Sequence, residues 1–425
     1  MTPDGAGSRA TLRAMALPAF VPTMLFEVGN GAVLPVVALT ALHLGASAGQ
    51  AAFMLALLGI GRILGDLPAS WLAQRVGDHR AMVAASALAV LAFATCAVAR
   101  SLLVLAAAVL VVGGATAVFY LARHSFLTVA APVALRARVM STLAGAHRVG
   151  MFVGPFVGAG VIALTDVRGA YVVAVVTSAC TAGLLLVVGD VDDTAPPAPA
   201  ATSSSWKVLV RYRRLFMTLG IGILAVGAVR AARQTVLPLW GESLHLSAEV
   251  ISLVFGVAGA AEMVLFYPAG RVMDTHGRLT VAVPAMAILG AGMMCLPLST
   301  GVVSVTLVAV VMAIGNGIGS GIMLTIGSDA APSDDRVRFL AVWRVFGDAG
   351  NALGPVCVSA LTALASLAVA IVGVGSLGLL GAAALARWTP RYSAFATRAA
   401  VRGRRLGHQQ PGPRRVTDDS RHSSS

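Results

Sequence analysis

Charged residues are scarce in this 425-residue chain: Asp, Glu, Lys and Arg make up 12% of it, whereas hydrophobic residues make up 57%. An ordinary soluble domain has about 25% charged residues, so the composition excludes a string of soluble domains. Lysine is almost missing, with Lys207 its single occurrence. The net charge of +13 does not indicate a nucleic-acid-binding surface, because the basic residues lie in short loops and in the C-terminal tail.

Cysteine is also scarce, and the four that occur all lie inside apolar segments without forming a C-x-x-C pair. This argues against a disulfide framework and against a cysteine metal site. The phosphate-binding sequence G-x-x-x-x-G-K-[ST] is missing, so direct coupling to ATP is not expected. The sequence also offers no nucleophile–base set and no cluster of metal ligands. We therefore expect no enzyme activity, no bound metal and no cofactor.

Long apolar runs fill most of the sequence instead. Runs of about 18 or more apolar residues are typical of transmembrane helices, which cross a hydrocarbon core about 30 Å thick at about 1.5 Å per residue. The first half has six such spans, at 16–42, 50–73, 80–99, 102–128, 139–164 and 169–188. The second half has six more, at 214–240, 248–271, 279–298, 302–328, 339–363 and 366–387. The sequence therefore predicts an all-α membrane protein with twelve transmembrane helices.

Between and around the spans the composition changes. The spans form two six-helix halves, 14–188 and 214–388, and a short segment, 1–13, precedes them. The connecting segment 189–213 is rich in Pro, Ser and Ala, which predicts a flexible linker. Residues 389–425 are rich in Arg and then polar, which predicts a disordered tail.

Basic residues gather in alternate loops, which predicts the orientation in the membrane. One set of loops and termini holds Arg9, Arg13, Arg75, Arg80, Arg136, Arg138, Lys207, Arg211, Arg213, Arg214, Arg271, Arg278, Arg336 and Arg338. The other loops carry little beyond Arg100 and Arg168. Because positively charged loops stay in the cytoplasm, both termini are expected there, in a multi-pass protein of the plasma membrane.

The two halves repeat at a constant offset of 200 residues. The repeated residues just before and within the fifth and eleventh spans are Arg136/Arg336, Arg138/Arg338, Gly150/Gly350, Gly154/Gly354 and Pro155/Pro355. Pro68-Ala69 and Gly77 recur at the same offset as Pro268-Ala269 and Gly277. Such self-similarity indicates a duplicated architecture.

The loop after the second span, PASWLAQRVGDHR, and the loop after the eighth, PAGRVMDTHGR, resemble the G-x-L-x-D-R-x-G-R-R loop of the major facilitator superfamily. The matching residues are Gly270, Asp274, Gly277 and Arg278 in the second half and Arg75, Gly77 and Arg80 in the first. The resemblance implies two pseudo-symmetric six-helix halves that transport by alternating access, and a loop aspartate that locks the cytoplasmic side. In the first half Gln74 stands at the position of that aspartate, so Asp66 is a candidate substitute.

The fifth span resembles the fifth-helix motif of proton-coupled antiporters in the same superfamily, through Gly145, Gly150, Gly154, Pro155, Gly158 and Gly160. Glycines 150, 154 and 158 share one helix face and allow a neighbouring backbone to approach closely. Pro155 removes a hydrogen bond and bends the helix. The resemblance implies antiport, with the packed seam limiting leakage. Because Gly350 and Gly354-Pro355 repeat part of the motif, the antiporter assignment depends on the additional glycines of the first half.

Ionisable side chains inside the spans are functional candidates, because each costs at least about 2.5–3.5 kcal/mol at the bilayer centre. The candidates for proton coupling are the acids Glu27, Asp66, Glu262 and Asp348. Glu27 is the first choice, since it lies near the middle of the first span, one turn from Asn30, and a moving Arg62 could change its affinity for protons. Glu262, which stands at the position equivalent to Arg62, is the second choice.

Bases outnumber acids within the spans, which favours an anionic or zwitterionic group on the substrate. The candidates for the substrate cavity are Asn30, Arg62, Arg123, Arg148, Arg230, Arg233, Gln234, Asn316 and Arg344. Arg230 and Arg233 lie one turn apart and are the natural contacts. The alternative for Arg62–Asp66 and Arg344–Asp348 is structural pairing at i,i+4. His124 and His147 are interpreted as interface or hydrogen-bonding residues rather than metal ligands.

We expect a secondary active transporter that exports small organic molecules or drugs in exchange for protons, driven by the proton gradient. The alternative within the same fold is a proton-coupled importer of nutrients or metabolites. A membrane enzyme or a non-transporting receptor is a third hypothesis, and the missing nucleophile–base set and metal-ligand cluster argue against the enzyme. The expected partners are the lipid bilayer, a small-molecule substrate and protons, with no nucleic acid, and the chain is expected to be a monomer.

Overall fold

The structure is a computed structural model that describes residues 12–189, 205–332 and 334–402. Within these residues every regular element is a helix. Helices suit a chain this apolar, because the hydrocarbon interior of a membrane offers no water to pair with the backbone N–H and C=O groups. Arg9 and the predicted linker and tail segments at 190–204 and 403–425 lie outside the described residues.

The first half consists of long helices joined by short turns. Its elements are η1 (Ala16–Phe20), α2 (Val21–Val33), α3 (Val36–His43), α4 (Ala48–Val76), α5 (Asp78–Val98), α6 (Leu102–Ala130), η2 (Val133–Leu135), α7 (Arg136–Leu164) and α8 (Gly169–Val188). Ser47 starts α4 with a capping box, in which its side chain accepts the Gln50 N–H while its own N–H donates to the Gln50 side chain. Side chains therefore fix where the turns end and the spans begin.

The second half repeats this order. Its elements are α9 (Ser205–Arg211), α10 (Arg213–Leu215), η3 (Phe216–Gly220), α11 (Ile221–Ser243), α12 (Ala248–His276), α13 (Leu279–Cys295), η4 (Leu296–Leu298), α14 (Val302–Gly319), α15 (Ile322–Ala330), α16 (Arg336–Leu364) and α17 (Leu367–Tyr392). Gly77 and Gly277 end α4 and α12 with φ angles of 87° and 96°. Only glycine adopts this left-handed region without strain, which explains why both halves keep it there.

Eleven membrane spans among the described residues are long and apolar enough to cross a bilayer. The eleventh of the twelve predicted spans, α16, has the length, 29 residues, but carries Arg344 and Asp348 in its middle. Two predicted spans are interrupted. The first breaks at Leu34-Pro35, where proline has no N–H to continue the helix, and the tenth breaks at Ser320-Gly321.

Two segments that the composition assigns to flexible chain are ordered where the structure describes them. Within the predicted linker, residues 205–211 form α9, and Arg211 donates to Asp335 over 3.2 Å. Within the predicted tail, α17 continues to Tyr392, and the backbone N–H of Arg278 donates to the carbonyl of Phe395. Both segments are held by tertiary contacts rather than by their own composition.

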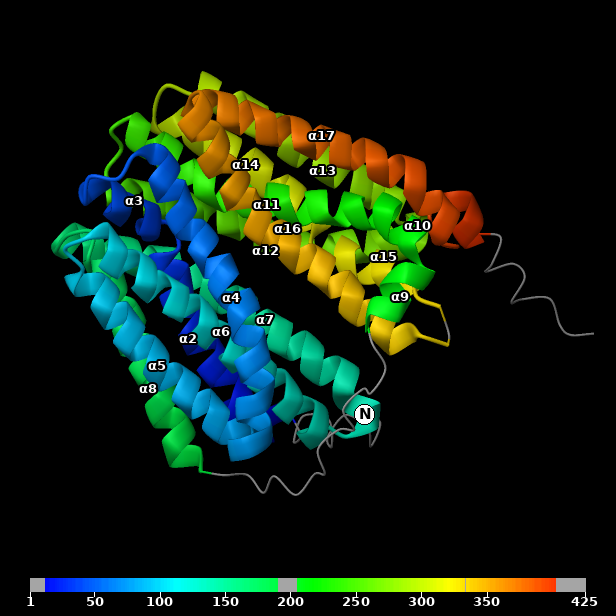
Figure 1. The fold of residues 1–425 in the computed structure, drawn as a ribbon, viewed down its shortest axis with the longest axis horizontal. Coiled ribbons are helices and arrows are strands. Elements are labelled where there is room, and N and C mark those ends of the chain that lie inside the picture. Colours follow the sequence, from blue (N-terminus) through cyan, green and yellow to red (C-terminus); the bar gives the residue numbers. More distant parts are fainter. Residues whose placement is uncertain (1–11, 190–204, 333, 403–425) are drawn as a thin grey trace, which may run out of the picture.

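The two halves lie one above the other in Figure 1, the first coloured blue to green and the second green to red. Their closest contacts pair α4 with α16 and α7 with α12. A Cβ atom placed on Gly59 of α4 would lie 3.1 Å from Cα of Ala352 in α16. A Cβ atom on Gly256 of α12 would lie 2.7 Å from the ring of Phe156 in α7. In Figure 1 the ribbons of the two halves lie closest together at the end of the bundle away from α9.

Candidate functional site

The fifth-span glycines form a seam between α7 and α2. A Cβ atom on Gly154 would lie 2.5 Å from the Val28 carbonyl oxygen, and one on Gly158 would lie 3.1 Å from Cβ of Ala32. A Cβ atom on Gly150 would lie 2.6 Å from Cβ of Glu27. Only glycine at these positions lets the two backbones approach so closely.

Gly145 and Gly160 have a different environment from the seam. A Cβ atom on either would meet no neighbouring helix within 4 Å among the described residues. The predicted seam therefore contains the glycines at 150, 154 and 158, while Gly145 and Gly160 do not take part in it. Pro155 lies inside α7 and lines a cavity between the halves.

The seam positions a fully buried carboxylate, that of Glu27 in α2. Nδ1 of His147, from α7, lies 2.9 Å from its Oε1, and Nη1 of Arg123, from α6, lies 4.0 Å from the same atom. Asn30 donates to Oε2 over 3.4 Å. The ring of Tyr120 lies beneath the Arg123 guanidinium, 4.6 Å from its Cζ. Three helices of the first half thus converge on one acid.

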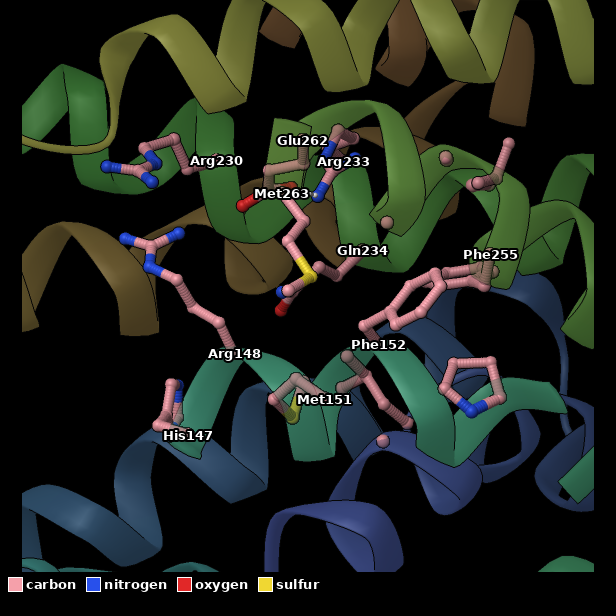
Figure 2. A pocket seen from close by; sticks show the side chains of 16 residues that line it. His147, Arg148, Met151, Phe152, Arg230, Arg233, Gln234, Phe255, Glu262 and Met263 are labelled. Carbon is pink, nitrogen blue, oxygen red and sulfur yellow. Dashed lines mark hydrogen bonds and ion pairs between the residues drawn. The ribbon is translucent and has the colours of Figure 1, made fainter. Parts of the chain in front are cut away.

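His147 connects this acid to a cavity of about 240 Å³ between the two halves. Its side chain is 38% exposed and lines the cavity, whereas that of Glu27 is 0% exposed. The polar part of the cavity wall consists of His147, Arg148, Arg230, Arg233, Gln234 and Glu262 (Figure 2). Five of these are on helices α7 and α11, and Glu262 is on α12, so both halves contribute to the cavity.

Charges in the cavity are only partly paired. Nη2 of Arg233 donates to Oε2 of Glu262 over 3.0 Å, which forms an ion pair within the second half. Nε of Arg230 donates to Oδ1 of Asn316 in α14 over 2.6 Å. The Arg148 guanidinium lies over the Phe266 ring, 3.7 Å from its centroid. The cation–π contact of Arg148 and the hydrogen bond of Arg230 to a neutral amide stabilise the two side chains without neutralising their charges.

Four predicted residues lie outside this cavity and gather between α4 and α16. Nε of Arg344 lies 3.5 Å from Oδ2 of Asp348, so the pairing expected at i,i+4 is present. Asp66 and Arg62 lie within electrostatic reach of that pair. Arg62 also lies over the Tyr120 ring, 5.8 Å from its centroid. The basic partners closest to Glu27 are therefore His147 and Arg123 rather than Arg62.

The second-half loop motif holds its own half together. Arg278 lies 2.8 Å from Asp274 and 2.9 Å from Asp329 of α15, and Ser393 donates to the same Asp329 over 2.7 Å. Burial opposes the charged form of Arg278, but hydrogen bonds to Asp329 and Asp274 outweigh it and raise its pKa. A Cβ atom on Gly277 would lie 2.6 Å from the backbone of Thr397. Among the described residues this motif thus contacts α15 and the C-terminal segment of its own half.

The first-half loop residues make other contacts. The Arg75 guanidinium lies over the Trp71 ring, 4.4 Å from its centroid. Arg80 lines a shallow surface pocket with His79 and Gly189, where the first half ends. A Cβ atom on Gly270, in the second-half loop motif, would meet no other helix within 4 Å among the described residues.

Sequence reasoning interpreted His147 as an interface or hydrogen-bonding residue and did not connect it with Glu27. A signal for its role was present in the repeat. At the offset of 200, Glu27 and His147 correspond to Gly227 and Gly347, and a Cβ atom on Gly227 would lie 2.6 Å from the Gly347 carbonyl oxygen. Where the second half packs glycine on glycine, the first half places an acid and a histidine in contact.

Two similar helical halves, a cavity between them and buried charges that face it define a class of protein, the polytopic membrane transporters. The model of the Major Facilitator Superfamily matches residues 19–355 and 219–405. The chain belongs to this family, and it is a membrane transporter rather than an enzyme. No curated protein sequence matches the chain.

Solved structures share the fold at low sequence identity. A POT family transporter in complex with a thioalcohol-conjugated peptide has a TM-score of 0.72 and 12% identity, covering 89% of this chain and 96% of that one. The nucleoside transporter NupG has a TM-score of 0.68 and 11% identity, covering 90% and 100%. A bacterial homologue of the human lysosomal transporter Spinster, inward-facing and unoccupied, has a TM-score of 0.64 and 14% identity, covering 92% and 97%. At these identities the likeness extends to the fold alone.

Proposed function

We propose that the chain is a proton-coupled antiporter that exports a small organic molecule, with Glu27 as the residue that takes up the proton. The observation that carries the proposal is the contact between Glu27 and His147. It joins a carboxylate buried in a membrane helix to the cavity between the halves. An acid inside a membrane protein is costly and is retained where it serves transport.

The surroundings of Glu27 suit a carboxylate that gains and loses a proton. His147 lies between Glu27 and the cavity, so a proton reaches the acid through the imidazole. Oε1 of Glu27 lies 2.9 Å from Nδ1 of His147 and 4.0 Å from Nη1 of Arg123, so the imidazole is the nearest group that can pass a proton to it.

Coupling follows from the positions of two adjacent residues on α7. His147 contacts Glu27 within the first half, while Arg148 reaches Phe266 in the second. Protonation of Glu27 removes its attraction to His147 and Arg123, which loosens α7 from α2. The same helix then moves Arg148 relative to the second half, so proton binding changes the cavity.

Export is preferred over import because Gly158 extends the seam beyond what the second half repeats. Val358 stands at the equivalent position and is fully buried. A longer glycine seam restrains α7 against α2 along more of its length, which limits uncoupled leakage of protons. We place both termini in the cytoplasm, because the basic residues gather in one set of alternate loops and positively charged loops stay in the cytoplasm.

The test uses everted membrane vesicles that store a proton gradient reported by a pH-sensitive dye. Adding compounds from an organic-acid and drug panel should discharge the gradient in the wild type, and Glu27→Gln should abolish the discharge. Glu262→Gln is the comparison variant, because Glu262 is the second candidate acid and is paired with Arg233 in the cavity wall. Coupled transport by Glu27→Gln together with its loss in Glu262→Gln would move the proton site to Glu262. If intact cells take up the compound in a way that depends on the proton gradient, the proposed direction of transport changes from export to import.

A further inference from the structure

The cavity contains two arginines, from opposite halves, whose charges the protein does not neutralise. Arg148 extends from α7 of the first half and Arg230 from α11 of the second, and in Figure 2 their guanidinium groups face each other across the cavity. The two charges lie within electrostatic reach of each other. Among the described residues neither forms an ion pair.

The acid of the cavity does not remove this excess of charge. Glu262 lies 3.0 Å from Arg233 and forms an ion pair with it. Its electrostatic interactions with Arg148 and Arg230 act over a longer range. The cavity wall thus contains three guanidinium groups and one carboxylate, which leaves an excess of two positive charges. Two like charges inside a membrane protein repel each other and oppose closure of the halves.

From this geometry we infer that the space between Arg148 and Arg230 is the binding site for the anionic head of the substrate, a carboxylate or phosphate group on an apolar body. Guanidinium groups bind these anions through paired, charge-assisted hydrogen bonds. Nε of Arg230 is occupied by Asn316, which fixes the side chain and leaves its terminal nitrogens for a ligand. This assignment rests on the proposed transport function, and it names the class of molecule transported.

The remaining wall fits the apolar body. Met151 and Phe152 of α7 and Leu237, Phe255 and Met263 of the second half line the cavity beyond the charged residues. Figure 2 shows Phe152 and Phe255 on the side of the cavity opposite Arg148 and Arg230, with Met263 between the two groups. The ligand is therefore an amphipathic organic anion, with its charge toward the two arginines and its apolar part toward the methionine and phenylalanine side chains.

An anion at this site also draws the halves together. In its absence Arg148 and Arg230 repel each other across the cavity, and an anion that both arginines bind replaces this repulsion by two attractions. Because one arginine belongs to each half, the attraction favours the conformation in which the halves close on the substrate.

Equilibrium binding to purified protein in detergent tests the inference apart from transport. The probes are phenylacetate and phenyl phosphate, with neutral phenylacetamide as the uncharged analogue, and intrinsic tryptophan fluorescence or thermal stabilisation reports binding. Arg148→Gln and Arg230→Gln should each raise the Kd of an anionic probe at least about tenfold, or about 1.4 kcal/mol. Phenylacetamide binding should stay the same. Arg271→Gln, which removes an arginine at the exposed end of α12, should change neither.

The double variant shows whether one anion contacts both arginines. If it does, the losses in the two single variants are not additive, since removing either guanidinium already disrupts the shared contact. A Kd for the anions that is unchanged in both single variants, or equal losses for phenylacetamide, would overturn the inference. Proton-coupled transport that persists with unchanged anion binding would overturn this inference and leave the proposed function standing. A ratio of Kd values for the two anions identifies the carboxylate or the phosphate as the preferred head group.

Discussion

The glycine seam allows a prediction in which two substitutions on one helix serve as test and control. Gly154→Ala and Gly160→Ala each add one methyl group to α7 and each replace the poorest non-proline helix former by the best, a gain of about 0.5–1 kcal/mol. They differ in their surroundings. The Cβ at 154 would lie 2.5 Å from the Val28 oxygen and 2.8 Å from both the Ala32 nitrogen and Cα of Gly31, whereas the Cβ at 160 meets no other helix.

All three atoms that face Gly154 belong to the backbone of α2, so no side chain can rotate away and α2 itself must move. Overpacking of this kind costs about 1–3 kcal/mol. We therefore expect Gly160→Ala to match or exceed the wild type in thermal stability in detergent, and Gly154→Ala to be less stable than Gly160→Ala by about 1–3 kcal/mol. Since α2 carries Glu27, the Gly154 variant should also lose proton-coupled transport. Equal stabilities of the two variants would refute the close approach of α7 and α2.

Two further predictions concern the loops. Asp329→Asn should destabilise the protein by about 3 kcal/mol and increase proteolysis in the segment 393–402, because it removes the buried one of the two acid partners of Arg278 and weakens the contact with Ser393. The exposed Asp274→Asn should cost less than about 1 kcal/mol. Equal effects of the two substitutions in thermal unfolding would contradict the network. The second prediction concerns orientation, because Thr300 and Ala134 lie in loops expected on opposite sides of the membrane. In a background without the native cysteines, Thr300→Cys should react with an impermeant maleimide in intact cells, and Ala134→Cys should react only in everted vesicles. The opposite labelling would reverse the assigned orientation.

The fold could be predicted because its signals are local. Apolar runs of the length of a bilayer define the spans, and the offset of 200 residues pairs them into two halves. The errors of detail occur where distant contacts determine the structure. Composition assigns residues 205–211 to a flexible linker, but the contact between Arg211 and Asp335 spans 124 positions and has no local signal. The same holds for the segment after Tyr392, whose Phe395 accepts a backbone hydrogen bond from Arg278.

The candidate site was less predictable, because helical periodicity indicates the face on which a residue lies but not the helix that this face contacts. Glu27 could be selected from its charge and depth alone. Its partner could not, since Arg62, Arg123 and His147 lie on three different helices and only the tertiary packing brings the last two to the acid. Likewise Arg230 and Arg233 look equivalent in sequence, and only Glu262 at 3.0 Å distinguishes the neutralised arginine from the charged one.

The broken symmetry of the repeat has a physical consequence where the halves meet. Position 148 on α7 faces position 262 on α12, and the repeat makes position 348 on α16 face position 62 on α4. The first half supplies the base in both of these longer-range electrostatic pairs, Arg148 and Arg62, and the second half supplies the acid, Glu262 and Asp348. Had the duplication kept the first-half residues in both copies, arginine would face arginine at both contacts, and the halves would repel. The glycines thus recur in both halves, because they permit close packing of helices within each half. The charges at the equivalent positions differ in sign between the halves, so the halves attract each other there and can still separate during transport.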